Sequence, residues 1–97
     1  MMGTRSHEEV TVESFRRNPG YAAEYLNAVL EDGDQAELMV ALRRVAGAFG
    51  GVAEVAEAAD LNATTLYRTL AQRGNPELKS LTAILKAMGL RIAVQPL

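Results

Sequence analysis

The residues best suited to chemistry lie in and just after one short segment, residues 62–72, and their types favour contact with nucleic acid. Small side chains at the start of a helix allow close approach to a major groove. Hydroxyl groups bind phosphates, and an arginine or glutamine reaches base edges. The predicted DNA-binding residues combine these types: Asn62, Ala63, Thr64, Thr65, Tyr67, Arg68, Gln72, Arg73 and Lys79.

Each of these residues also has an ordinary structural interpretation. Arg68, the leading candidate for a base or phosphate contact, could instead be a solvated arginine paired with Glu57. Thr64 and Thr65 could bind phosphate or simply occupy the first turn of a helix. Tyr67 could contact the DNA backbone, although packing over the preceding turn is slightly favoured.

The charges of the chain are divided unevenly. Residues 1–60 carry five arginines against eleven carboxylates, whereas residues 61–97 carry five cations against one carboxylate. The chain as a whole has a net charge of −2. A basic C-terminal part can meet phosphates, while the acidic part faces elsewhere or binds a basic partner. Uneven surface charge without function remains the simpler alternative.

Catalytic and metal-binding chemistry finds little support. There is no cysteine, and the single histidine, His7, lies in a polar N-terminal stretch. Glu31, Asp32 and Asp34 surround a glycine between two predicted helices, so capping and turn formation explain them better than an acid pair. We therefore expect no enzyme activity, no catalytic residues, no cofactor and no metal. No apolar run approaches the length of a membrane span, and we expect a cytoplasmic protein without membrane contact.

Apolar residues recur at helical spacing along most of the chain, so helices are expected to position the predicted DNA-binding residues. Asn18-Pro19 is a typical helix start, and Asp32-Gly33 should end that helix. Asp34 can cap a second helix, which Gly50-Gly51 should stop. Residues 1–18 show no such pattern and are expected to be flexible or extended, with Thr11–Phe15 as a short extended segment anchored by Phe15. A DNA-binding domain is predicted over residues 19–97.

Two short helices follow, joined by a tight turn at Asp60-Leu61-Asn62. The first, over Val52–Ala59, is rich in alanine, and Ala56 marks the point where a larger side chain would push the helices apart. The second should run from Ala63 to about Gln72, capped by Asn62. This spacing is that of a helix-turn-helix. The shared core of the pair is predicted to contain Val55, Ala59, Leu61, Leu66 and Leu70.

The C-terminal part should hold a fifth helix and a strand. Gly74 is expected to end the fourth helix in a left-handed conformation, and Asn75-Pro76 to start the fifth, with Asn75 as a cap. Gly89 should end the fifth helix, after which residues 90–96 alternate as a strand does. The expected apolar face of the fifth helix consists of Leu78, Leu81, Ile84, Leu85 and Met88.

Residues 19–96 resemble the helix-turn-helix antidote proteins of addiction modules, the HigA-type antitoxins, within the wider lambda-repressor-like superfamily. The resemblance rests on an ordered set of stretches: Tyr25 to Asp34, Ala41 to Ala46, Thr65 to Leu70, Gly74-Asn75-Pro76 and Leu85 to Arg91. The chain departs from the superfamily pattern at Asp60, where glycine is usual, and at Thr69, where an apolar residue is usual. Leu70 should then fill the place in the core that an apolar residue at position 69 usually fills.

The resemblance implies an all-α fold of five helices, here with a short C-terminal β-strand. It also implies a homodimeric repressor that binds its own operator in double-stranded DNA and neutralises a RelE/ParE-like toxin. The alternatives are a stand-alone phage-type repressor and a protein-binding module that mainly covers a basic toxin. Arg43-Arg44 could touch a toxin or a second subunit, although a solvated face is the simpler interpretation. The expected dimer surface is Leu90–Gln95 with part of the fifth helix.

Overall fold

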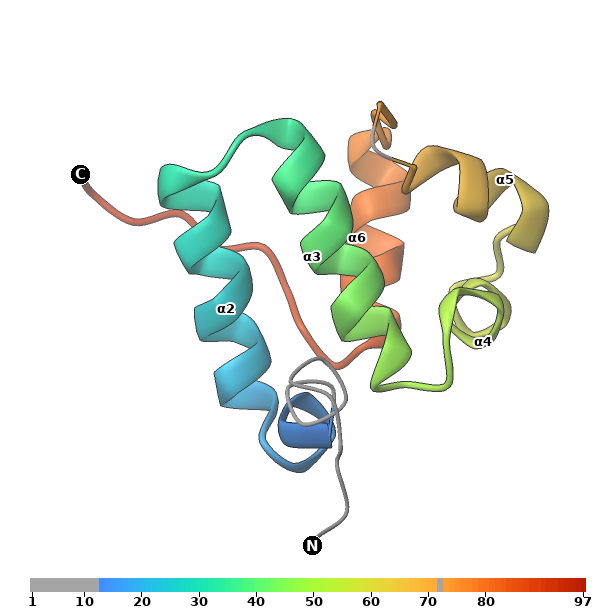
Figure 1. The fold of residues 1–97 in the computed structure, drawn as a ribbon, viewed down its shortest axis with the longest axis horizontal. Coiled ribbons are helices and arrows are strands. Elements are labelled where there is room, and N and C mark those ends of the chain that lie inside the picture. Colours follow the sequence, from blue (N-terminus) through green and yellow to red (C-terminus); the bar gives the residue numbers. More distant parts are fainter. Residues whose placement is uncertain (1–12, 72) are drawn as a thin grey trace, which may run out of the picture.

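The computed structural model describes residues 13–71 and 73–97, and they form a packed array of helices (Figure 1). The predicted all-α class is confirmed. The described residues form six helices, one more than predicted, because residues 13–17 are also helical. The other five are α2 (Pro19–Asp32), α3 (Gln35–Gly47), α4 (Val52–Ala58), α5 (Ala63–Thr69) and α6 (Leu78–Ala87). None of the helices in this described part is long and apolar enough to cross a membrane.

The first two long helices begin where their capping residues predict, and α2 ends before Gly33 as expected; α3 ends at Gly47, earlier than the predicted stop at Gly50-Gly51. The Asn18 side chain accepts a hydrogen bond from the Tyr21 backbone N–H at 3.3 Å, at the start of α2. At α3, the Asp34 carboxylate accepts from the Glu37 backbone N–H at 2.8 Å, and the Glu37 carboxylate accepts from the Asp34 N–H at 3.4 Å. This reciprocal capping box satisfies two backbone donors that a helix start leaves unpaired. The predicted structural role of Asp34 is confirmed.

Helix α3 lies at the centre of the core. α2 packs on one side of it and α4 on the other, and α6 packs against α4 in turn (Figure 1). The side chains of Ala41, Leu42, Val45 and Ala46 are all buried, so α3 presents a broad apolar stripe to both neighbours. Such a stripe stabilises a helix through tertiary packing rather than through its own propensity.

The N-terminal region differs from the sequence prediction. Thr11 and the preceding residues lie outside the described part, but residues 13–17 are helical where an extended segment was expected. A backbone bond from Asn18 N–H to the Ser14 carbonyl, at 2.9 Å, closes this helical turn. Phe15 is fully buried, with its ring centroid 5.0 Å from that of Tyr25, so its predicted role as an anchor is confirmed. Hydrophobic anchoring and local hydrogen bonding thus select the helix.

The predicted C-terminal strand is wrong. Leu90 N–H bonds to the Leu85 carbonyl at 2.8 Å, and no strand is assigned anywhere in residues 13–71 and 73–97. The chain beyond Leu90 instead runs past α2 towards the C-terminus (Figure 1). The alternation of side chains indicates which face of a sheet each would take, but a strand also needs a neighbouring segment for its backbone hydrogen bonds. Residues 13–15, which belong to the segment expected to be extended, are helical and so offer no strand edge for pairing.

Helix α6 starts later than predicted. Its N-cap is Glu77, which makes no side-chain capping bond, so Asn75 is not the cap of this helix. The later start leaves Leu78 71% exposed instead of in the core. Ile84, Leu85 and Met88 are buried as predicted. Gly89 follows at a φ of 76°, the left-handed conformation that ends helices and suits glycine.

Candidate nucleic-acid interface

Helices α4 and α5 form a closely packed pair whose directions differ clearly (Figure 1). Ala56 of α4 is fully buried. So are Leu66 of α5 and Leu70, which follows α5; no more than 2% of the surface of any of the three is exposed. Leu70 therefore takes over the packing beside Thr69, as predicted. A methyl group at position 56 lets the helices approach, because a longer side chain there would have to displace one of them.

The turn between α4 and α5 explains the departure at Asp60. Asp60 has a φ of 59°, and within residues 13–71 and 73–97 it is the non-glycine residue with positive φ. Its N–H bonds to the Glu57 carbonyl at 3.2 Å, and the N–H of Leu61 bonds to the Ala56 carbonyl at 2.8 Å. These are the two bonds of a Schellman motif, whose left-handed position favours glycine. Aspartate tolerates this conformation better than most residues, so the turn closes without glycine.

Helix α5 begins at a side-chain cap. The Asn62 Oδ1 atom accepts a hydrogen bond from the Thr65 backbone N–H at 2.9 Å. The predicted capping role of Asn62 is confirmed, and it fixes the direction in which α5 leaves the turn. Helix α5 ends at Thr69, before the predicted end at Gln72, which lies outside the described residues.

The outward face of α5 consists of the side chains that the sequence singled out. Thr64, Thr65, Tyr67 and Arg68 are exposed, and Ala63 is half-buried. Tyr67 is 56% exposed, so the packing alternative does not account for most of its ring. In the described part of the chain, no ion pair joins Arg68 to a carboxylate, Glu57 included. This face is polar, carries a positive charge and is open to a ligand.

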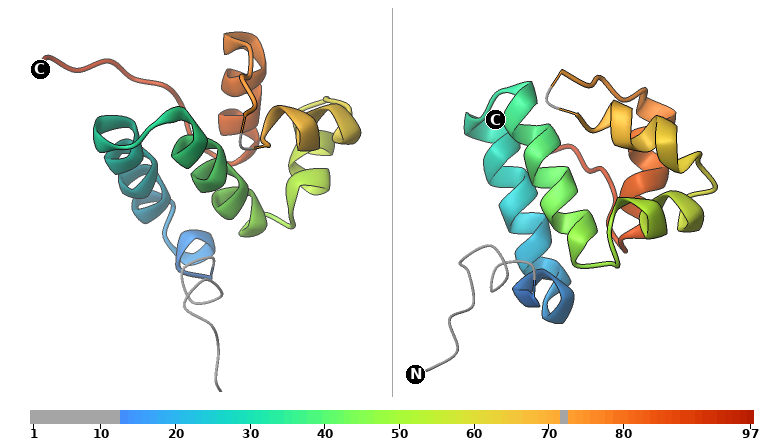
Figure 2. Two further views of the ribbon diagram at one scale, coloured as in Figure 1. Left: turned by 45° about the horizontal axis from the view of Figure 1, so that its top comes forward. Right: turned by 45° about the vertical axis from the view of Figure 1, so that its right-hand side comes forward.

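Two further cations follow α5. Arg73 lies in the connection to α6, and Lys79 lies in the first turn of α6; both are exposed. Figure 2 shows this connection rising beside the C-terminal end of α5. The structure thus brings the predicted cations Arg68, Arg73 and Lys79 to the α5–α6 side of the molecule.

The connection that carries Arg73 is held in place by α3. The Gln35 side-chain amide donates to the Gly74 carbonyl at 2.6 Å, and a Cβ on Gly74 would collide with the Thr69 carbonyl. Gly74 is therefore required for close approach, and its predicted left-handed conformation is wrong. Sequence analysis missed Gln35, because a contact between residues 39 positions apart leaves no local pattern.

Metal chemistry gains no support from the described residues, among which no group of three histidine, cysteine or carboxylate side chains could hold an ion. The buried side-chain polar atoms of this part all have hydrogen-bond partners. The exposed face of α5 therefore remains the candidate site.

Comparison with known protein families identifies the chain. The model of the family described as "probable addiction module antidote protein" matches residues 9–96. The chain belongs to this antidote family. No curated protein and no solved structure matches it.

Membership of the antidote family supports an antitoxin role and implies, in general, a toxin as partner. The matched range includes the helical segment 13–17 and its buried Phe15, as well as α2 to α6. The family description names no DNA site and no type of toxin.

Proposed function

We propose that this protein is the antitoxin of a type II toxin–antitoxin module. It binds the operator of its own operon as a homodimer in the cytoplasm, represses transcription and neutralises a RelE/ParE-like toxin without itself catalysing a reaction. The observation that carries the DNA-binding part is the exposed polar face of α5, mounted on α4 through Ala56 and Leu66.

On this proposal, α5 is the recognition helix of a HigA-type, lambda-repressor-like helix-turn-helix. Arg68 projects from it towards base edges, while Thr64 and Thr65 donate hydrogen bonds to phosphates. Arg73 and Lys79 contact the backbone next to the groove and are expected to set orientation rather than sequence preference. Two protomers place their α5 helices in successive major grooves, about 34 Å apart.

The proposal is tested by measuring the affinity of the full chain for the DNA upstream of its own gene. Arg68→Ala should weaken specific binding by about 1–3 kcal/mol if Arg68 contacts a base. Arg17→Ala, which removes a 77% exposed arginine from the segment before α2, is the matched control and should bind nearly as the unmodified chain does. Fluorescence anisotropy on specific and scrambled duplexes gives both affinities.

The salt dependence separates two roles for Arg68. A base contact lowers the affinity for the specific duplex only, whereas a phosphate contact lowers both affinities and reduces the salt slope by about 1. Unchanged affinity and footprint in Arg68→Ala would remove this residue from the interface. Failure of the unmodified chain to distinguish the two duplexes would contradict operator binding.

The stand-alone phage-type repressor is the alternative that lacks a toxin. The antidote family match favours a toxin partner over it. A small basic protein encoded next to this chain, and co-purifying with it, would support the antitoxin proposal. Isolation of the chain alone, despite co-expression with its neighbours, would favour the repressor.

A further inference from the structure

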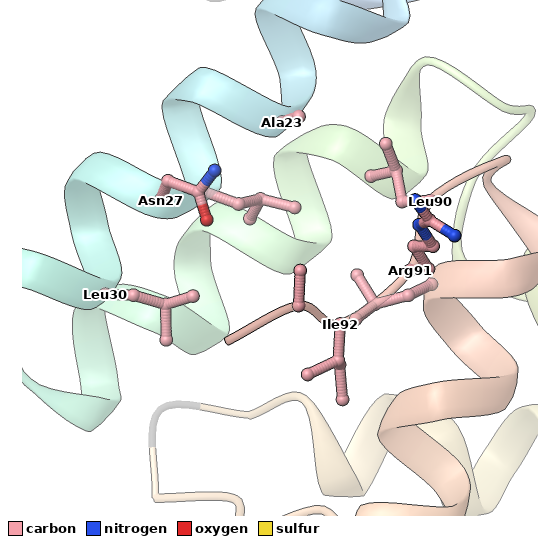
Figure 3. A pocket seen from close by; sticks show the side chains of 9 residues that line it. Ala23, Asn27, Leu30, Leu90, Arg91 and Ile92 are labelled. Carbon is pink, nitrogen blue, oxygen red and sulfur yellow. The ribbon is translucent and has the colours of Figure 1, made fainter. Parts of the chain in front are cut away.

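Helix α2 and the C-terminal segment enclose an apolar groove, which we call the α2 groove (Figure 3). Its walls are formed by Ala23, Leu26, Asn27 and Leu30 of α2, with Leu90 and Ile92 opposite them. None of the residues assigned to DNA contact lines it.

The α2 groove exposes large apolar side chains. Leu30 is 62% exposed and Ile92 46% exposed, on opposite sides of the groove, and Val94 further along the same segment is 94% exposed. One exposed leucine on a surface is ordinary, but apolar side chains gathered at a groove mark a binding surface. Covering them would remove apolar area from water, which favours association.

The side of α2 that borders the groove is acidic, whereas the charged residue that lines the groove itself is Arg91 of the C-terminal segment. Glu24, Asn27 and Glu31 lie along this side of α2, since they are spaced by three and four residues, and Asn27 lines the groove. Helix α2 contains no lysine or arginine. Across residues 13–71 and 73–97, no ion pair engages Glu24, Glu31 or Asp32. Glu31 and Asp32 moreover occupy the last turn of α2, where the helix dipole disfavours negative charge.

We propose that the α2 groove docks a basic protein. Apolar side chains of that partner cover Leu30 and Ile92, and its lysines or arginines face Glu24 and Glu31. The inference rests on the proposed function, in which the partner is the toxin, and it assigns that partner a surface separate from α5.

A second copy of the chain fits the α2 groove less well. In a two-fold arrangement the same patch meets itself, so the carboxylates of both copies would gather at one interface. Arg91, which lines the groove, is the cation each copy would bring against them. A basic partner neutralises the same carboxylates without bringing new ones.

The test uses the full chain and the basic protein encoded next to it, co-expressed and purified as a complex. Two variants change the groove: Leu30→Ser removes an exposed apolar contact, and Glu31→Lys reverses one charge on the acidic side of α2. Their matched controls are Leu78→Ser, at a position 71% exposed on α6, and Glu54→Lys, at an exposed position on α4. Affinity is measured by titration calorimetry at low and high salt, and operator binding is measured in parallel.

The groove variants should each weaken the complex about tenfold or more, and the controls should not. The effect of Glu31→Lys should shrink at high salt, since ions screen exposed charges, whereas that of Leu30→Ser should persist. Full affinity in both groove variants would overturn the inference and leave the antitoxin proposal standing. No complex with the unmodified chain would overturn both. A dimer that dissociates in Leu30→Ser, with partner affinity unchanged, would assign the groove to a second copy.

Discussion

Asp60 shows how a single residue can satisfy a turn that favours glycine. Its backbone adopts a φ of 59°, and the two hydrogen bonds of the turn hold it there. A left-handed conformation costs a residue with a Cβ about 1–2 kcal/mol, and less for aspartate, which adopts it more readily than most residues. The α4–α5 turn therefore retains some strain that glycine would not have.

Asp60→Gly should raise the free energy of unfolding by about 0.5–1 kcal/mol, because relief of the left-handed strain exceeds the extra chain entropy of glycine. Asp60→Ala should lower it by about 1 kcal/mol, since alanine adopts the left-handed conformation less readily than aspartate does. Urea denaturation of the three proteins checks the order. An alanine variant as stable as the glycine variant would contradict the account of strain.

At the scale of elements, capping residues predicted the starts of α2, α3 and α5 well. Asn18, Asp34 and Asn62 each accept the backbone bond that their position implies. Asn75 failed as a predictor although Asn75-Pro76 repeats the Asn18-Pro19 pattern, because α6 begins only at Leu78. The same dipeptide is also typical of loops, and here it lies in the irregular connection before α6, next to Gly74, whose carbonyl accepts a bond from Gln35.

The exposed face of α5 could also be predicted from local sequence. The exposure of Thr64, Tyr67 and Arg68 depends on local helical spacing and on the buried position of Leu66, which are both visible in a short window. The C-terminal strand could not be predicted in this way, since pairing depends on a second segment that the alternation of residues 90–96 does not specify.

The α4–α5 pair should be sensitive to the size of residue 56. Ala56→Leu is expected to lower the free energy of unfolding by about 1–3 kcal/mol, because the side chain has no space between the helices. Ala58→Leu, on the exposed side of α4, should change it by less than about 0.5 kcal/mol. Thermal unfolding measures both.

Binding of the Ala56→Leu variant to operator DNA is the second measurement. At a temperature where this variant is still folded, its affinity should fall further than that of Ala58→Leu, since α5 is displaced. Equal affinities of the two variants would show that the position of α5 tolerates a larger residue at 56.

Across the whole molecule, the segment before α2 is part of the folded core. Phe15 is fully buried between the rings of Tyr21 and Tyr25, with centroids 5.3 Å and 5.0 Å away. The Arg16 Nε–H donates to the Ala48 carbonyl at 2.9 Å, which ties this segment to the end of α3. The segment thus connects α2 and α3 at one end of the molecule, a role that sequence periodicity from residue 19 onward does not reveal.

Phe15→Ala should therefore lower the free energy of unfolding by about 3–5 kcal/mol, through lost burial and the cavity left behind. Arg17→Ala is the control; its side chain is 77% exposed and pairs with Glu13 at 2.8 Å, a surface contact worth less than about 1 kcal/mol. Chemical denaturation compares the variants. If Phe15→Ala unfolds like Arg17→Ala, the segment contributes little to the core.

The exposed face of α5 has an evolutionary consequence. Leu66 is buried and Ala63 and Thr69 are half-buried, so the exposed positions 64, 65, 67 and 68 are the ones only lightly constrained by folding. Substitutions there can accumulate without loss of a stable protein. If α5 contacts DNA as proposed, duplicated copies of the gene can therefore diverge in the DNA sequences they bind while keeping one fold.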